Sequence, residues 1–392
     1  MRYKVELASF LLLCLDFLAL LYGVSTLSIS EDEAKIFFSD EKTALWYLLQ
    51  SFVYLFGQND LALRTPILLL HFLSCILLFI LALKLTKNKK DAFFSLLLFV
   101  LLPGTVASAL IVNEASLVIF ISLLILCAYE YKRKILFYIF FILALFIDKS
   151  FLILFLAFFF FSLYKKDYLL FWLSLLLFSL SFSFYGFDTS GRPYGFFLDT
   201  LGIFAACFSP LVFVYFFYVI YRLFLKEDKP LLWFIMSVTF IFCSLLSIRQ
   251  KVYLDDFLPF CVISTPLLVS TFMSSYRVRL PKFRLKYNVL IQCAFIFLLL
   301  FYLVLIFNPL LYSYLKNPSR HFAYNYHGAK ELALELKKHG IYAIKTNKAM
   351  QLRLKFYGIS SNSKLLLQKS TKRGDIVLSF GPLKEYYRIK YP

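Results

Sequence analysis

Long apolar runs separated by short polar segments fill the chain from residue 5 to residue 308. Many of the runs approach the ~20 residues that a helix needs to cross ~30 Å of hydrocarbon. The pattern predicts transmembrane helices near 5–27, 66–84, 92–112, 116–130, 135–147, 150–163, 169–185, 200–225, 231–248, 257–275 and 289–308. The segments 135–147 and 150–163 are short at ~1.5 Å per residue, so they fit either one long tilted helix or a hairpin. Basic residues on both flanks favour the hairpin, with Asp148-Lys149-Ser150 at its outer tip.

Composition supports a membrane protein, since 61% of the 392 residues are hydrophobic and 20% are aromatic. A soluble chain of this length has too few polar residues to cover so much apolar surface. The seven cysteines all fall inside apolar runs and form no Cys-x-x-Cys pair, which argues against a disulfide framework or a zinc site. We therefore expect an all-α polytopic membrane protein of about ten or eleven helices.

Charge placement predicts the orientation of these helices. The net charge of +19 would suggest nucleic acid, but the basic residues gather in alternate loops, near residues 2–4, 84–90, 132–134, 165–166, 222–229 and 277–286. Acidic segments lie in the other loops, and positive loops face the cytoplasm. We expect a cytoplasmic N-terminus in the bacterial inner membrane, a periplasmic C-terminus, the bilayer as partner, and no nucleic acid.

The polar segment after residue 308 predicts a change of domain. We assign residues 1–308 to a transmembrane domain and residues 309–392 to a small soluble α/β domain on the periplasmic side. Apolar periodicity and bounding glycines predict two helices in it, Gly328–His339 and Lys348–Tyr357, and three strands, Ile341–Ile344, Leu365–Gln368 and Ile376–Phe380.

The first outer loop, residues 28–65, carries the clearest chemical pattern. Ser30 followed three residues later by Glu33 is a capping box, which predicts a helix start. If Glu33 folds back onto Ser30, Asp32 is left free, and a carboxylate beside a low-dielectric pocket suits a general base. The aromatic-rich stretch Thr43–Phe56 predicts a helix lying in the membrane interface.

These patches resemble the GT-C membrane glycosyltransferases, in particular the branch of protein O-mannosyltransferases and the lipid A aminoarabinose transferase. The resemblance rests on Asp32-Glu33 after the first span and on later motifs. These are Phe56-Gly57-x-Asn59-Asp60-x-Ala62-Leu63-Arg64-x-Pro66, Val112-Asn113-Glu114-Ala115, Leu145-x-x-Asp148-Lys149-Ser150, and Ser247-x-Arg249-x-Lys251-x-Tyr253 with Pro259.

The resemblance implies transfer of a sugar from a polyprenyl-phosphate donor to a lipid, glycan or protein hydroxyl on the outer face. It implies catalytic roles for Asp32 and Glu33. It places the donor phosphate on Lys149, Arg249, Lys251 and Arg64, and gives acceptor binding or charge balance to Glu114 and Tyr253. Fixed cations near the leaving phosphate would stabilise the transition state. No cofactor is firmly implied besides the lipid-linked donor as substrate. A divalent metal is compatible with the chemistry but no residue pattern supports it, so no metal ligand is assigned.

Several alternatives fit the same residues. Arg64, Arg249 and Lys251 also suit headgroup anchors, and Glu114 suits an ordinary loop acid. Asp16 lies inside the first span, where an acid is costly, so we expect it to pair with a hydroxyl of another helix or to face a wet cavity. A flippase for lipid-linked sugars and an inactive protein of GT-C fold remain alternative functions.

Overall fold

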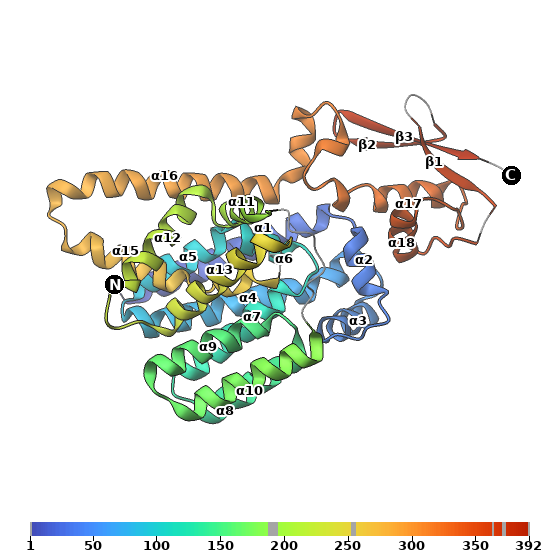
Figure 1. Ribbon diagram of the computed structural model, residues 1–392. Coiled ribbons are helices and arrows are strands. Elements are labelled where there is room, and N and C mark those ends of the chain that lie inside the picture. Colours follow the sequence, from blue (N-terminus) through green and yellow to red (C-terminus); the bar gives the residue numbers. More distant parts are fainter. Residues whose placement is uncertain (1, 187–194, 252–255, 363, 371–373, 391–392) are drawn as a thin grey trace. The chain divides into compact units, whose positions relative to one another are not determined.

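The computed structural model describes residues 2–186, 195–251, 256–362, 364–370 and 374–390 (Figure 1). The chain divides into two compact units. The first consists of residues 1–17, 69–109 and 113–302, and the second of residues 18–68, 110–112 and 303–392. Helices α1 (Arg2–Thr26), α4 (Asp60–Thr86) and α16 (Pro281–Ile306) each contribute to both units.

Each predicted span coincides with a helix or a pair of helices. Besides α1, α4 and α16, they are α5 (Lys89–Leu101), α6 (Pro103–Leu110), α7 (Ala115–Glu130), α8 (Lys134–Ile147), α9 (Phe151–Lys165), α10 (Tyr168–Tyr185), α11 (Phe197–Phe208), α12 (Pro210–Phe224), α13 (Leu231–Arg249), α14 (Leu258–Val262) and α15 (Thr265–Val278). In the described residues, six spans are long and apolar enough to cross a membrane, and two bent pairs raise the number to eight. The chain is a multi-pass membrane protein.

Two of the predicted spans, 92–112 and 200–225, each consist of two helices that meet at a bend, which the apolar pattern alone does not indicate. Helices α5 and α6 meet at 59°, and α11 and α12 meet at 107°. A proline begins the second helix of each pair, Pro103 and Pro210, and proline cannot donate a helical N–H bond. Ser209, before Pro210, has a φ of 64° and ends α11.

Helices α8 and α9 form the hairpin favoured by their flanking charges. Phe137 packs on Phe158 with ring centroids 5.5 Å apart, and Phe141 packs on Phe155 at 5.1 Å. The later residue of α8 pairs with the earlier residue of α9, so the two helices are antiparallel. Asp148 makes the turn by accepting a bond from the Ser150 backbone N–H at 2.8 Å.

The second unit contains the segment after α1 and the C-terminal residues. Its helices are α2 (Glu31–Phe37), α3 (Ala44–Phe56), α17 (Ala329–Lys338) and α18 (Lys348–Phe356), with short 3₁₀ turns at Asn308–Tyr314, Pro318–Arg320 and Tyr324–Tyr326. Three antiparallel strands, β1 (Leu366–Ser370), β2 (Ile376–Phe380) and β3 (Leu383–Lys390), pair in the order β1-β3-β2. Buried residues of α17, α18 and the sheet form one apolar core, including Leu332, Leu336, Leu354, Leu378 and Ile389.

The soluble part contains one wrong strand prediction and one missed strand. Residues 341–344 form no strand, because Ala343 makes only an isolated bridge to Ser360. The central strand β3 was not predicted. Its inward residues are Glu385, Tyr387 and Ile389, and the residues between and beside them are the exposed Lys384, Arg388 and Lys390 and the half-buried Tyr386. An inward acid and an outward tyrosine hide the two-residue period of the strand. The helices and the other two strands agree with their predictions within about two residues.

Candidate functional site

Helix α2 begins with the predicted capping box, which the structure confirms. The Ser30 hydroxyl accepts the Glu33 backbone N–H at 3.2 Å, and the Glu33 carboxylate accepts the Ser30 N–H at 2.8 Å. The three acids at its start, Glu31, Asp32 and Glu33, also complement the positive end of the helix dipole. The cap fixes which way the two acids point: Glu33 turns inward and Asp32 turns outward.

The inward acid, Glu33, forms a buried ion pair. Its Oε2 lies 2.6 Å from a guanidinium nitrogen of Arg64 on α4, and its Oε1 accepts the Val112 backbone N–H at 2.9 Å. The Arg64 side chain is fully enclosed and also donates to the carbonyl oxygen of Ser28 at 3.1 Å. Because every atom of this pair is out of solvent, the segment after α1 and the start of α4 are held in one arrangement.

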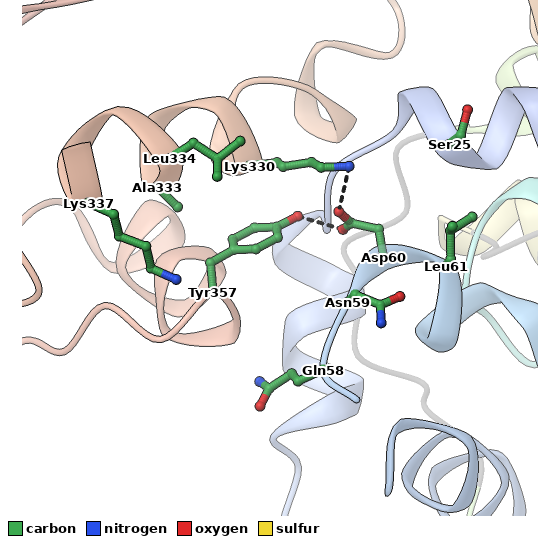
Figure 2. A pocket seen from close by; sticks show the side chains of 10 residues that line it. All are labelled: Ser25, Gln58, Asn59, Asp60, Leu61, Lys330, Ala333, Leu334, Lys337 and Tyr357. Carbon is green, nitrogen blue, oxygen red and sulfur yellow. Dashed lines mark hydrogen bonds and ion pairs between the residues drawn. The ribbon is translucent and has the colours of Figure 1, made fainter. Parts of the chain in front are cut away.

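A second buried acid, Asp60, extends this network toward the C-terminal helices. Its carboxylate lies 3.8 Å from Arg64. It also lies 3.5 Å from the Lys330 ammonium of α17 and accepts the Tyr357 hydroxyl at 2.6 Å (Figure 2). The Tyr357 oxygen also accepts the Ile29 backbone N–H at 3.0 Å. Burial, and then the Asp60 charge, raises the pKa of Tyr357, so the phenol keeps its proton as donor.

Arg353 of α18 ties the same two segments together a second time. Its guanidinium donates to the Ile29 carbonyl at 2.7 Å, the Ser28 hydroxyl at 3.2 Å and the His327 carbonyl at 2.8 Å. Burial lowers the pKa of His327 to about 4, so this imidazole is neutral near pH 7 and accepts or donates only as a neutral ring. The C-terminal helices are therefore part of the site, and do not form a separate appendage.

A cavity of about 370 Å³ lies along this network (Figure 2). Its lining includes Asp60, Tyr357 and Lys330, together with Lys337, Ser25, Gln58 and Asn59. Carboxylate, phenol, amide and ammonium groups together can bind sugar hydroxyls, and the lysines can also bind an anionic headgroup. Among the predicted residues, the structure joins Glu33 and Arg64 in one ion pair. Arg64 lies 3.8 Å from Asp60, which lines this cavity.

The outward acid, Asp32, is accessible. Its side chain is 86% exposed, and within the described part of the chain its ion-pair partner is Lys35, which lies 3.0 Å away on the next turn. Lys35 is shared with Glu31 at 2.8 Å, and both contacts are on the surface, where an ion pair contributes little. The carboxylate is therefore free to approach another molecule.

The remaining predicted residues belong to the first unit. The Lys149 ammonium lies 3.1 Å from Asp256, and the neighbouring acids more than offset burial, so the pKa of Lys149 is raised and the side chain is charged. Burial, and then Asp148, raises the pKa of Glu114, which precedes α7. Arg249 and Lys251 are exposed at the end of α13. Tyr253 lies outside the described residues, and the predicted meeting of Asp32 with these cations stays a prediction.

Comparison with solved structures identifies the architecture. ArnT from Cupriavidus metallidurans in the apo state superposes with a TM-score of 0.53 at 12% identity, over 74% of this chain and 62% of that one. The same enzyme bound to undecaprenyl phosphate gives a TM-score of 0.55 at 11% identity, over 91% of this chain and 85% of that one. The chain has a GT-C-type fold.

This GT-C-type fold confirms the resemblance drawn from the sequence motifs. The chain spans less than two thirds of the apo ArnT chain, and at these identities the similarity extends to the fold alone. No protein-family model matches the sequence, and no curated protein matches it.

Sequence reasoning missed the partners of Asp60. Asp60 lies in one of the motifs, which gives it no role of its own, and Lys330, Arg353 and Tyr357 fall within the two helices predicted for the C-terminal segment. Tyr357 contacts Asp60 across 297 positions of sequence, so no local spacing connects them. The one available signal is that Tyr357 precedes Gly358 at the end of a short basic helix, which does not specify a partner.

Proposed function

We propose that the chain is a membrane glycosyltransferase of the bacterial inner membrane. It moves a sugar from a polyprenyl-phosphate-linked donor to a hydroxyl of a lipid, glycan or protein on the outer face. Two findings taken together support the proposal. The fold is similar to that of a protein crystallised with undecaprenyl phosphate. The exposed acid Asp32 lies on α2 next to Glu33, which forms a buried ion pair with Arg64.

In this proposal Asp32 is the general base. Its carboxylate takes the proton of the acceptor hydroxyl as that oxygen attacks the anomeric carbon of the sugar. The bond between the anomeric carbon and the phosphate oxygen breaks, and the electron pair leaves with the polyprenyl phosphate. A base positioned in this way contributes typically about 10²–10⁴-fold to the rate.

Glu33 and Arg64 act in the proposal by positioning Asp32. Both side chains are buried and form an ion pair with each other, so neither is accessible to an acceptor in this structure. Of the four cations assigned to the donor phosphate, Arg64 is the one with buried protein partners. We therefore propose that Arg64 stabilises the position of α2 and does not bind the donor phosphate.

The other three cations, Lys149, Arg249 and Lys251, remain the proposed phosphate ligands. Arg249 and Lys251 are exposed, and Lys149 is held by Asp256 but half exposed, so each has an accessible charge. Fixed positive charge is worth most where negative charge develops, which is on the departing phosphate. Glu114 and Tyr253 are proposed to orient the acceptor or balance charge.

The test compares Asp32→Asn with Glu31→Gln in a strain that lacks the gene. Glu31 is a control because it lies on the same helix turn, has 43% of its side chain exposed, and shares the same lysine. Mass spectrometry of glycolipids and glycoproteins is expected to show a sugar that the wild type and Glu31→Gln restore and Asp32→Asn does not.

Two outcomes would contradict the proposal. Full restoration by Asp32→Asn would remove the base assignment. Unchanged glycans in the deletion strain, with lipid-linked precursor accumulating on the inner leaflet, would favour the flippase alternative.

A further inference from the structure

Three groups that bind metal ions meet inside the first unit. Asp16 lies on α1, and His71 and Cys75 lie one turn apart on α4. All three side chains are buried, and their ligand atoms lie within 4.8 Å of one another. His71 Nε2 is 3.0 Å from Asp16 Oδ2 and 3.6 Å from Cys75 Sγ.

The spacing of these atoms suits a zinc ion. Residues four apart on a helix share one face, the spacing with which helices present paired metal ligands. Tetrahedral zinc with bonds of about 2.0 Å to N and O and 2.3 Å to S places its ligand atoms roughly 3.3–3.7 Å apart. The nitrogen–sulfur separation already fits, and the nitrogen–oxygen separation needs a small opening.

Neighbouring side chains supply the outer contacts that such a site uses. The Tyr302 hydroxyl of α16 donates to Asp16 Oδ1 at 2.9 Å, which leaves Oδ2 facing the histidine. The His71 ring stacks on Phe99 with centroids 6.0 Å apart and planes within 13°. A group that hydrogen-bonds to the other oxygen of a metal-binding carboxylate, or that packs on a metal-binding imidazole, fixes the orientation of that side chain toward the metal.

The charge of the cluster also favours a divalent cation. An isolated carboxylate is costly in the apolar part of a membrane helix. Zn²⁺ with one carboxylate, one thiolate and one neutral imidazole has no net charge, so its burial is tolerated where a lone acid is not. The tyrosine contact meets the expectation of a hydroxyl partner for Asp16, but it leaves the histidine and thiol unexplained.

We propose that Asp16, His71 and Cys75 bind a zinc ion that links α1 to α4. Binding releases the thiol proton and any proton shared by Asp16 and His71 to solvent, since the ligands coordinate in their deprotonated forms. This cluster leaves no signal in the sequence, because Asp16 and His71 are 55 positions apart and the cysteines form no Cys-x-x-Cys pair. The site is separate from the proposed transferase chemistry.

The experiment measures metal in the full-length protein purified in detergent without chelators. Elemental mass spectrometry is expected to find about one zinc per chain in the wild type, and at least a roughly ten-fold loss in Cys75→Ser and His71→Gln, because each removes one of three ligands. Cys261→Ser and His339→Gln are matched controls, a buried thiol and an exposed imidazole outside the cluster. Tyr302→Phe is expected to weaken zinc affinity about 10–100-fold.

Cobalt substitution separates a metal site from a hydrogen-bonded network. Bound Co²⁺ is expected to show a thiolate charge-transfer band that Cys75→Ser abolishes and Cys261→Ser keeps. Equal zinc and cobalt binding by the wild type and Cys75→Ser would overturn the proposal. So would a wild type without metal and without the band after dialysis against zinc or cobalt, which would leave an Asp–His–Tyr network. Neither readout depends on transferase activity, and Cys75→Ser carries the test if His71→Gln fails to fold.

Discussion

The contribution of the buried Glu33–Arg64 ion pair to the free energy of unfolding can be predicted and measured. Both side chains are enclosed, and each has further partners. Removing one member of a buried pair leaves an uncompensated charge and typically costs about 3–5 kcal/mol of unfolding free energy. We therefore expect Glu33→Gln and Arg64→Met to destabilise the second unit strongly.

The surrounding contacts rank the two variants. After Glu33→Gln, Arg64 keeps Asp60 at 3.8 Å, which places the loss near the lower limit of about 3 kcal/mol. After Arg64→Met, the carboxylates of Glu33 and Asp60 both lose their shared cation, which places it near about 5 kcal/mol. The double variant has no unpaired Arg64 charge and is expected to cost about 2 kcal/mol or more below the sum of the singles.

Trp46 gives a local reporter for this measurement. Its indole donates to the Phe37 carbonyl at the end of α2, at 3.2 Å. The chain has three tryptophans, so a background with Trp172→Phe and Trp233→Phe leaves Trp46 as the only fluorophore of its kind. Denaturant titration in detergent, followed by Trp46 emission, then yields the free energies of the two single variants and the double variant.

Lys35→Met is the control for charge removal on the same helix. Lys35 pairs only at the surface, so the loss is expected to stay below about 1 kcal/mol. Our reasoning is refuted if Glu33→Gln and Arg64→Met unfold like Lys35→Met, or if their effects add without coupling.

Two further predictions concern the C-terminal helices. Tyr357→Phe removes the hydrogen bond to the buried Asp60 carboxylate and is expected to cost about 1.5–3 kcal/mol, whereas Tyr342→Phe, at an exposed ring, is expected to be neutral in the same titration. In the folded protein the pKa of His327 is lowered to about 4, so between about pH 6.5 and pH 4 the unfolded chain binds a proton that the folded chain does not. As the pH is lowered through this range, the free energy of unfolding is therefore expected to decrease by up to roughly 3 kcal/mol. His327→Gln should flatten this dependence and His339→Gln should not; equal pH profiles for the two would contradict the assignment.

Local patterns predicted the fold well where the signal was short in range. Apolar runs located the membrane helices, and the Ser30–Glu33 spacing predicted the cap that orients Asp32. Charges on both flanks separated α8 from α9, which hydropathy alone did not. These features depend on residues within a few positions of one another, so one sequence is enough to see them.

Features that depend on distant residues were not predicted. The Tyr357 and Lys330 contacts to Asp60 join chain segments about 300 positions apart in sequence, as does Arg353 with Ile29. The partners of Asp16 were predicted only as a class of group, because a hydroxyl partner follows from electrostatics and a histidine 55 positions away does not. The bends at Pro103 and Pro210 were visible as prolines but were outweighed by continuous hydropathy.

The bonds from Arg353 and Tyr357 to Ile29, and from Tyr357 to Asp60, have a topological consequence. They place the C-terminal helices on the same side of the membrane as the start of α2 and the start of α4. Between Asp60 and Asn308 the chain must then cross an even number of times. The long helices from α4 to α16, with each bent pair counted once, supply seven of the candidate crossings in the described residues. If each bent pair is one crossing, an odd number of the short helices α7, α8 and α9 crosses as well. Such short helices cross only where the bilayer thins around them.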